Sequence, residues 1–346
     1  MTPRSCRRLA WLLAAGCAAA TAAQPQQWLD RMNEALTRRN YDGVFSHWQG
    51  GRVETLRILH RIRDGVVTER LVSLDGSGRE FIGTGSTLTC YLPDQRTVLV
   101  ERRTDATLLG NLPRFDDSMR DYYSVESLGT ERLLGRRTEL IALRPRDGFR
   151  YGYELWIQHR TGMPLKTALV NADGQVIEQV VFSSLSLRPD IADAAFKPDV
   201  DTAGFRWLRN DPAPAGTAET VPELPVLPPG FRMTAHDAHS MPGADEPVQH
   251  LVFSDGIASV SVFLQPYAGP AGQVAASLVQ MGPSSYFTAV AGGRKYVAVG
   301  VVPPATLRYV VDGFMREAAG PQAVPPHVPA PATTAVAAAP VATSGR

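Results

Sequence analysis

The sequence predicts an α+β protein with two antiparallel domains, carried by a chain that is exported from the cytoplasm. Three observations predict this: an apolar segment at the amino terminus, a long series of short strand-like runs, and a proline-rich stretch after which the strand pattern resumes. A mature chain of about 320 residues is also longer than one ordinary hydrophobic core requires. We therefore expect a larger first sheet, a linker and a smaller second sheet.

Residues 1–23 have the layout of a secretory signal peptide. Three arginines precede an apolar run at 9–20, and the small residues 21–23 follow it. The apolar run is too short to span a bilayer. Cleavage before Gln24 is therefore expected, while lipidation at Cys17 is the alternative, because Ala15-Gly16-Cys17 loosely resembles a lipoprotein cleavage box.

Removal of the signal peptide lowers the formal net charge from +1 to −2, because the peptide contains three arginines and no acidic residue. A chain so close to neutral has no bulk attraction to nucleic acid. It also retains a single cysteine, Cys90, and so has no internal disulfide. Within "STLTCYL", Cys90 is expected to be a small buried hydrophobe rather than a reactive thiol.

The mature chain is expected to open with one short helix. In "QWLDRMNEALTRR" the spacing places Trp28, Met32, Ala35 and Leu36 on one helical face. The stretch 40–43 ends the periodic pattern. A single apolar face indicates that the helix packs on the sheet that follows.

Short strands are expected from Val44 to Leu185, with one apolar and one polar face. Within "VETLRILHRIR", Leu56, Ile58 and Ile62 lie on one face. Turns as short as those found here force neighbouring strands to be antiparallel. The turn signals are Gly50-Gly51, Asp64-Gly65, Asp75-Gly76, Pro93-Asp94, Asp147-Gly148, Thr161-Gly162 and Asp173-Gly174.

An aromatic and aliphatic row occurs in "RYGYELWIQHRTGMPLKTALV", which predicts two strands around a Thr161-Gly162 turn. Tyr151, Tyr153, Leu155 and Ile157 share one face of the first strand. Alternation does not show whether this row faces a fixed core or a cavity that takes an apolar ligand. Both interpretations remain open at this point.

Residues 102–127 interrupt the strand pattern. This stretch is expected to form helical turns and loop that cover the sheet. Leu108 and Leu112 are then either exposed or packed against a neighbouring apolar surface. These two leucines are therefore candidates for the same apolar site as the aromatic row.

Composition divides the mature chain into four parts. The first domain is expected at 24–200 and a linker at 201–225, where Pro, Ala and polar residues dominate. The second domain, at 226–318, offers several strands and a final helix with an apolar stripe. The Ala/Pro-rich part, 319–346, is expected to be disordered.

Motifs for enzymatic chemistry are absent. The sequence contains no HExxH, GxSxG, P-loop or CxxC pattern, so we expect neither an enzyme nor a cofactor. His236, His239 and His250 could form a metal site, but solvated histidines are the favoured interpretation. The acidic residues Asp116, Asp117 and Asp121 are similarly expected to form a solvated turn rather than a cation site.

An arginine-rich stretch at 133–150 could contact phosphates or an acidic peptide. Its candidate residues are Arg136, Arg137, Arg144 and Arg146. Arginine supplies nearly all the basic residues of this chain, so ordinary solvated strand faces are the alternative.

Four segments, which follow one another in the same order along the chain, resemble the MucB/RseB family, the periplasmic regulators of envelope-stress sigma factors. The resemblance extends from about Trp28 to Phe314 and thus covers both expected domains. The segments are "NYDGVFSHWQGGRVETLRILHR", "RDGFRYGYELWIQHRTGMPLK", "VLPPGF" and "VFSDGIASVSVFL".

The resemblance implies a first domain like those of LolA and LppX, a curved antiparallel half-barrel with covering helices. It implies a periplasmic protein that binds the periplasmic segment of a membrane anti-sigma factor and shields it from site-1 proteolysis. Release would follow when lipid-like components such as mislocalised lipopolysaccharide bind. Homo-oligomerisation stays open. The alternatives are a periplasmic lipid or lipoprotein carrier and, less favoured, an envelope hydrolase.

The signal-peptide interpretation is tested by mass spectrometry of the exported protein. We expect an unmodified mature chain that starts near Gln24, because the small residues before it suit signal peptidase. A diacylated Cys17 at the mature amino terminus would contradict this prediction.

Overall fold

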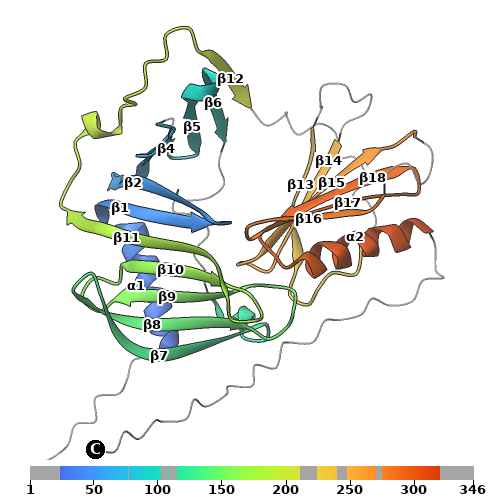
Figure 1. Cartoon of the computed structure of the whole chain (residues 1–346), viewed down its shortest axis with the longest axis horizontal. Helices are drawn as coiled ribbons and strands as arrows, with labels where there is room; N and C mark the ends of the chain where they lie inside the picture. The colour runs from blue at the N-terminus through green and yellow to red at the C-terminus, as the bar shows by residue number, and fades with distance from the viewer. Residues whose placement is uncertain are drawn as a thin grey trace, which may run out of the picture.

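The computed structural model forms two β-sheets, each with one α-helix packed on it (Figure 1). No helix in the described part of the chain is long and apolar enough to cross a membrane. The structure describes residues 24–76, 78–102, 108, 115–210, 224–239, 248–269 and 275–319.

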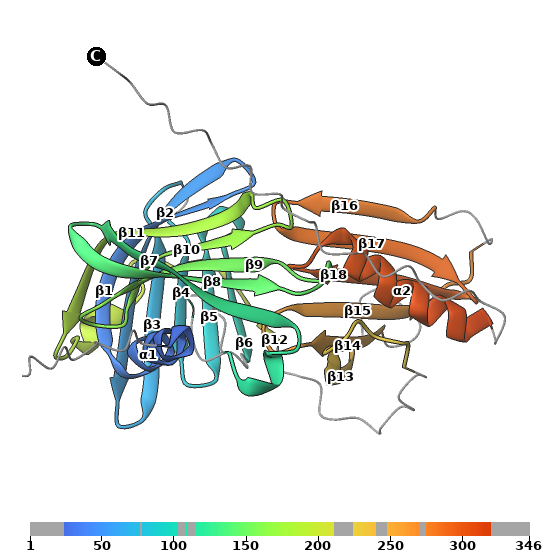
Figure 2. The same cartoon turned by 90° about the horizontal axis from the view of Figure 1, so that it is seen from below.

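The first helix, α1 (Pro25–Arg38), packs on one face of the first sheet (Figure 2). Proline at its first turn suits a helix start, because that backbone N–H has no intrahelical partner. The helix buries Trp28, Met32, Ala35 and Leu36 as the periodicity predicts, and also Leu29.

The first sheet has twelve strands in the order β12-β6-β5-β4-β3-β2-β1-β11-β10-β9-β8-β7. All neighbouring strands are antiparallel except β12, which runs parallel to β6. Pairing of β1 with β11 joins the early and late strands into one curved sheet. The strands are β1 (Asn40–Gln49), β2 (Arg52–Arg63), β3 (Val66–Ser73), β4 (Glu80–Thr84), β5 (Thr87–Leu92), β6 (Thr97–Arg102), β7 (Tyr123–Leu133), β8 (Arg136–Pro145), β9 (Gly152–Gln158), β10 (Pro164–Val170), β11 (Val176–Arg188) and β12 (Arg206–Asn210).

The second sheet is a smaller antiparallel sheet in the order β13-β14-β15-β18-β17-β16. The second helix, α2 (Pro304–Ala319), packs on it and buries an apolar stripe as predicted. The described residues of the first domain also form three short 3-10 helices, η1 (Pro93–Gln95), η2 (Asp117–Met119) and η3 (Asp193–Phe196). The strands are β13 (Arg232–His239), β14 (Val248–Ser254), β15 (Ser259–Pro266), β16 (Ser277–Met281), β17 (Ser284–Ala291) and β18 (Arg294–Gly300).

The predicted α+β class and the large curved antiparallel sheet with a smaller second sheet are confirmed, but three local expectations differ. Residues 123–127, which were expected to be helical turns or loop, form the start of β7, and a register shift follows between Ser127 and Gly129. Strand β12 lies inside the stretch 201–225 that was expected to be a linker. Strand β16 was not predicted, because all five of its side chains are exposed.

Cys90 lies on β5 and is 6% exposed. Burial, together with the nearby carboxylate of Glu101, raises the pKa of its thiol to about 11. Only about one thiol in a thousand is then ionised at pH 8, against roughly a quarter for an ordinary exposed cysteine.

We therefore expect iodoacetamide at pH 8 to leave Cys90 unmodified in the native protein and to label it fully in urea. Mass spectrometry of both samples measures this. Rapid labelling of the native protein would show that the thiol is accessible and ionised.

Candidate functional site at the junction of the two sheets

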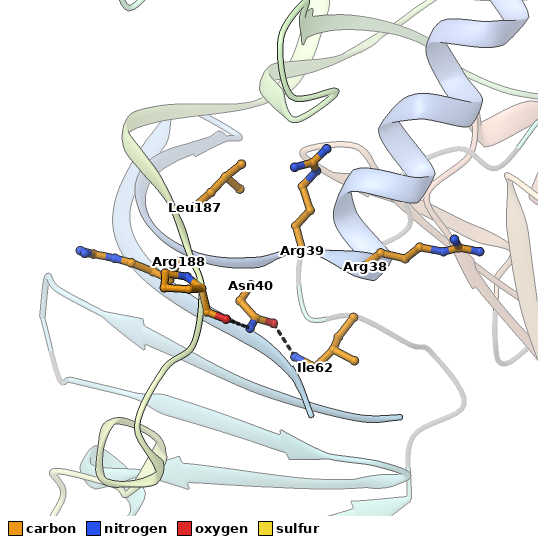
Figure 3. A pocket seen from close by; sticks show the side chains of 7 residues that line it. Arg38, Arg39, Asn40, Ile62, Leu187 and Arg188 are labelled. Carbon is orange, nitrogen blue, oxygen red and sulfur yellow. Dashed lines mark hydrogen bonds between the residues drawn. The ribbon is translucent and has the colours of Figure 1, made fainter. Parts of the chain in front are cut away.

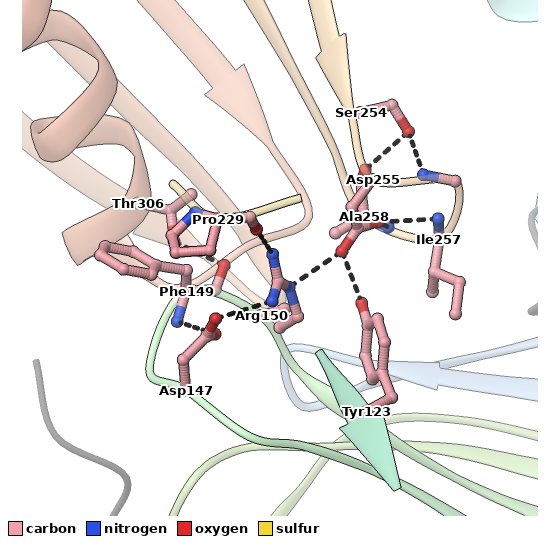
Figure 4. A network of polar contacts seen from close by, with 11 residues as sticks. Tyr123, Asp147, Phe149, Arg150, Pro229, Ser254, Asp255, Ile257, Ala258 and Thr306 are labelled. Carbon is pink, nitrogen blue, oxygen red and sulfur yellow. Dashed lines mark hydrogen bonds and ion pairs between the residues drawn. The ribbon is translucent and has the colours of Figure 1, made fainter. Parts of the chain in front are cut away.

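Three loop segments meet between the two sheets. They are the connection between β8 and β9 at 146–151, the stretch 226–231 before β13, and the β14–β15 turn at 254–258 (Figure 4). The side chain of Arg150 lies at their centre and is 2% exposed.

The guanidinium of Arg150 is held by both domains. Its Nε lies 2.9 Å from Oδ2 of Asp255 in the second domain. Its Nη1 donates a hydrogen bond of 2.7 Å to Oδ2 of Asp147 in the first domain. Its Nη2 donates to the carbonyl oxygen of Pro229. A buried charge is costly without such partners, so this set of contacts determines where the arginine can lie.

Aromatic rings enclose the same guanidinium. Its central carbon lies 5.1 Å from the ring centroids of Tyr122 and Phe231, and 5.4 Å from that of Tyr123. Rings at this distance stabilise a cation through their negative faces. The arginine is therefore paired, hydrogen-bonded and shielded from water at once.

Asp255 also organises the turn that carries it. Its Oδ1 accepts hydrogen bonds from the backbone N–H groups of Ile257, at 2.8 Å, and Ala258, at 2.7 Å. Its Oδ2 accepts a bond of 3.0 Å from the hydroxyl of Tyr123. Burial and the Asp255 carboxylate raise the pKa of Tyr123 well above its ordinary value, so the hydroxyl stays protonated and donates.

Two glycines permit the close approach of the domains. Gly230, at φ +82°, faces the ring of Tyr122, and a Cβ there would lie 2.6 Å from a ring carbon. Gly256, at φ +99°, faces the terminal methyl of Met119, which is the end of a flexible side chain. Both positions therefore need glycine for the backbone conformation, and Gly230 needs it for space as well.

Further contacts extend the junction on both sides of Arg150. The hydroxyl of Thr306, in the first turn of α2, donates a 2.7 Å bond to the carbonyl of Phe149. The side-chain amide of Gln280 on β16 donates a 3.3 Å bond to the hydroxyl of Tyr151. Ile257 packs into the hydrophobic cluster of the first domain. The two domains thus contact each other on both sides of Arg150.

The predicted apolar row, Tyr151, Tyr153, Leu155 and Ile157, faces the covered side of the first sheet. Leu155 and Ile157 are fully buried in the cluster that α1 closes, and Tyr153 packs against it. Tyr151 is 6% exposed and lies at the junction. Among the described residues, this row therefore packs against the core that α1 covers.

Leu108 is partly buried and packs against the same cluster. Its backbone N–H donates a 2.8 Å hydrogen bond to Oε2 of Glu69, a fully buried carboxylate on β3. Leu112 lies outside the described residues.

The four candidate arginines do not converge on one site. Arg136 donates to the carbonyl of Leu185, while Arg144 lies near Glu126 and Glu154 at 3.8 and 3.7 Å. Eight residues separate Arg136 from Arg144 along β8, which is about 27 Å of extended chain. The other two, Arg137 and Arg146, are exposed.

Nothing in the described residues brings together three or more side chains that could hold a metal ion. His250 stacks on Phe263 at 4.4 Å, and His236 lies opposite Leu251 in the pairing of β13 with β14. Asp116 accepts hydrogen bonds from Ser118 and so caps its own turn. The side chains of Asp117 and His239 lie outside the described part.

Two family models match the chain and together cover both domains. The MucB/RseB N-terminal domain matches residues 24–200, and the MucB/RseB C-terminal domain matches residues 219–315. The chain belongs to the MucB/RseB family.

Individual relatives show the same two-domain match. The chain is 33% identical to the sigma factor AlgU regulatory protein MucB of Pseudomonas aeruginosa over 308 residues, which cover 87% of this chain and 94% of MucB. It is 26% identical to the sigma-E factor regulatory protein RseB of Escherichia coli K12, over 84% of this chain and 90% of RseB. These relatives are regulatory proteins by name.

Among solved structures, the complex of P. aeruginosa MucA and MucB contains a similar chain. The TM-score is 0.65 at 31% identity, and the match covers 83% of this chain and 96% of that chain. Both domains therefore share their fold with a protein that has been solved together with a partner.

The segments 146–166, 226–231 and 252–264 carry part of the resemblance to the MucB/RseB family. The structure brings all three together around Arg150, and this convergence was not predicted. The available signal was that each segment carries a turn glycine or proline beside a charged or aromatic residue. No pattern in the sequence indicates that these segments are in contact.

The Arg150–Asp255 pair is tested by Asp255→Asn. We expect the free energy of unfolding to fall by about 3 kcal/mol, because the buried guanidinium loses its partner charge from the second domain. Calorimetry should show the single unfolding transition splitting into two, one for each domain.

The matched control is Asp147→Asn, which removes a carboxylate that pairs with the same arginine from within the first domain. This variant should lower the melting temperature without splitting the transition. A single cooperative transition in Asp255→Asn, as sharp as that of the wild type, would contradict a coupling role for the pair.

Proposed function

We propose that this protein is a periplasmic negative regulator of an envelope-stress sigma factor. It binds the periplasmic segment of a membrane-bound anti-sigma factor and shields that segment from site-1 proteolysis. The observation that carries the proposal is the match of both domains to MucB, a sigma factor regulatory protein that has been solved in a complex with MucA. The signal-peptide layout of residues 1–23 supports export.

The junction supports a role in binding a protein segment. The buried Arg150–Asp255 pair and the contacts on both sides of it connect the two sheets, so a segment that touches both domains meets a preorganised surface. Preorganisation lowers the entropy that binding must overcome. A ligand that changes this arrangement would then change the affinity for the partner.

Lipid-triggered release is the second part of the proposal. The row of Leu155 and Ile157 is apolar and lies under α1, so an acyl chain can reach it only if α1 moves. One contact that holds α1 against the first sheet lies near the middle of the helix. Arg31 donates to the carbonyl of His159, and its guanidinium lies 4.4 Å from the ring centroid of Trp28. Lipid entry and α1 packing therefore compete for the same apolar surface.

The test is a purified system that contains the anti-sigma periplasmic segment and its site-1 protease. Addition of this protein should slow cleavage, and titration with lipopolysaccharide should restore it. Unchanged cleavage in the presence of the protein would contradict the proposed shielding. Acyl cargo bound without any affinity for the segment would favour a lipid or lipoprotein carrier.

Arg31→Ala tests the movement of α1. The substitution removes one charge-assisted hydrogen bond at the helix surface without placing a charge in the core. Lipopolysaccharide should then restore cleavage at a concentration about fivefold lower than for the wild type.

Asp30→Ala is the matched control, because Asp30 is an exposed neighbour on the same helix that accepts only a long bond, 3.4 Å, from Gln26. It should behave like the wild type. Equal lipopolysaccharide sensitivity of Arg31→Ala and the wild type would contradict lipid entry beneath α1. If both proteins still slowed cleavage of the anti-sigma segment, the proposed shielding would remain supported.

A further inference from the structure

Residues 189–200, which we call the strap, lead from β11 toward β12 across the first sheet (Figure 1). Ile191 and Phe196 of the strap pack on Leu59 of β2. Leu59 and its neighbour Ile58 point to opposite faces of that strand, and Ile58 belongs to the cluster beneath α1. The strap therefore crosses the face of the sheet that α1 does not cover.

The strap is held in place where it begins. The side chain of Asn40, at the start of β1, donates a 3.1 Å hydrogen bond to the carbonyl of Pro189 and accepts a 2.8 Å bond from the backbone N–H of Ile62 (Figure 3). The buried guanidinium of Arg61 on β2 donates a 2.8 Å bond to the carbonyl of Ile191. Strands β1 and β2 thus fix the first residues of the strap.

A buried ion pair holds the end of the strap. Arg70 on β3 and Glu80 on β4 lie 2.8 Å apart, and both side chains are buried. Arg70 also donates to the carbonyl of Ala195, at 3.0 Å, and to Oδ2 of Asp199, at 2.6 Å. Glu80 accepts a 2.9 Å bond from the backbone N–H of Asp199. Buried charges are costly unless they are fully partnered, so the strap has one arrangement here and sets where β12 begins.

Strand β12 follows the strap and forms one edge of the first sheet. It pairs with β6 and with no other strand in the part of the chain that the structure describes. The side chains of 206–209 are exposed, with Trp207 at 58% and Leu208 at 40%. The strand lies between 24–200 and 219–315, the two stretches that the family models match, so the resemblance assigns it no role. Burial of apolar surface does not explain why the chain carries a strand to this edge.

The outer edge of β12 presents backbone groups that β6 does not use. Arg206 donates its backbone N–H to the carbonyl of Arg96 at 2.8 Å, and so faces β6. Alternate residues of a parallel strand bond to the same neighbour, so Leu208 faces β6 as well. The backbone groups of Trp207 and Arg209 then point away from the sheet. An edge of this kind is a template for another strand, and β12 contains neither the proline nor the bulge that would block it.

The charges on β12 disfavour a second copy of this chain at the same edge. Arg206 and Arg209 make no ion pair with any residue that the structure describes. If two copies of β12 paired antiparallel about Trp207 and Leu208, Arg206 of each copy would lie opposite Arg209 of the other. Like charges directly opposite each other destabilise a strand pair. The same two arginines favour a strand that carries carboxylates at these positions.

The order of side chains along β12 defines the complementary strand. Arg206 and Leu208 lie on one face, and Trp207 and Arg209 lie on the other. An added strand therefore meets one basic and one apolar side chain on each face. Its best match is four consecutive residues in the order acidic, apolar, apolar, acidic, and this order reads the same in both chain directions.

We propose that β12 binds an extended segment of a partner protein that contains this acidic-apolar-apolar-acidic pattern. The segment adds to the sheet as a thirteenth strand beside β12, through backbone hydrogen bonds at Trp207 and Arg209. Tryptophan and arginine are enriched at protein interfaces, which fits the side chains found at this edge. The docking edge is separate from the junction around Arg150 and does not rest on the proposed regulatory function.

The experiment uses the mature protein and three synthetic peptides with blocked ends. The peptide TEVIET carries the complementary pattern, TVEEIT has the same composition and charge in the inverse pattern, and TKVIKT has lysines in place of the glutamates. Amide NMR shifts and hydrogen exchange are recorded during each titration. We expect TEVIET to give saturable shifts in β12, and the other two to bind at least tenfold more weakly.

Hydrogen exchange distinguishes strand addition from a side-chain contact. Bound TEVIET should slow exchange of the amides of Trp207 and Arg209, because only these gain a new acceptor. The amides of Arg206 and Leu208 already face β6 and should change little. Slowed exchange at Arg206 and Leu208 instead, or at none of the four, would contradict strand addition at this edge.

Two variants test the charges. Arg206→Gln/Arg209→Gln should bind TEVIET about tenfold more weakly, and Arg206→Glu/Arg209→Glu should prefer TKVIKT. Binding of TKVIKT by the glutamate variant also shows that this variant is folded. The matched control is Arg137→Gln/Arg160→Gln, which loses the same charge at two exposed positions of the same domain outside β12.

Several outcomes would overturn the proposal. Equal affinity for TEVIET and TVEEIT would show that charge alone attracts the peptide, as would equal weakening by the control variant. Shifts of β12 with phosphatidylglycerol vesicles, and none with TEVIET, would assign the edge to a membrane surface. Self-association of the wild type through β12, seen in sedimentation and in the same amides without peptide, would assign it to a second copy.

Discussion

The buried ion pair between Arg150 and Asp255 is the constraint on which the two-domain arrangement depends. Removing two charges from water costs several kcal/mol for each ion, so the pair is tolerated only when geometry and hydrogen bonds are nearly complete. Asp147, Pro229 and Tyr123 supply those bonds. Apolar contacts between the domains are non-directional and would permit many orientations, whereas this network is satisfied in one.

The strand that follows Arg150 connects the junction to the covered core. Tyr151, directly before β9, contacts β16 of the second domain, while Leu155 and Ile157 on β9 pack beneath α1. One continuous piece of chain therefore takes part in both the junction and the covered core.

Alternation and turn residues predicted most strands, because one buried face leaves a period-two pattern. Helix α1 was predicted with its correct apolar face for the corresponding reason. Strand β16 was missed because its side chains are exposed, so burial left no pattern to detect. The start of β7, at 123–127, was expected to belong to the loop before it. No sequence pattern indicated that Arg150 is buried, since a charge within a strand pattern normally points to water. Its partner lies 105 positions later, a distance over which local patterns carry no information.

The first domain uses arginine in two opposite ways at its two ends. Arg150 is enclosed, and its charge is compensated by carboxylates that cannot leave, so its contacts are permanent parts of the fold. At the other end, Arg39 and Arg188 lie in water, where a weak or absent partner costs little. Only the second situation suits an exchangeable ligand, because an arginine that already has full compensation gains nothing from a new anion. Burial, more than the residue type, therefore distinguishes a structural arginine from one whose contacts can change.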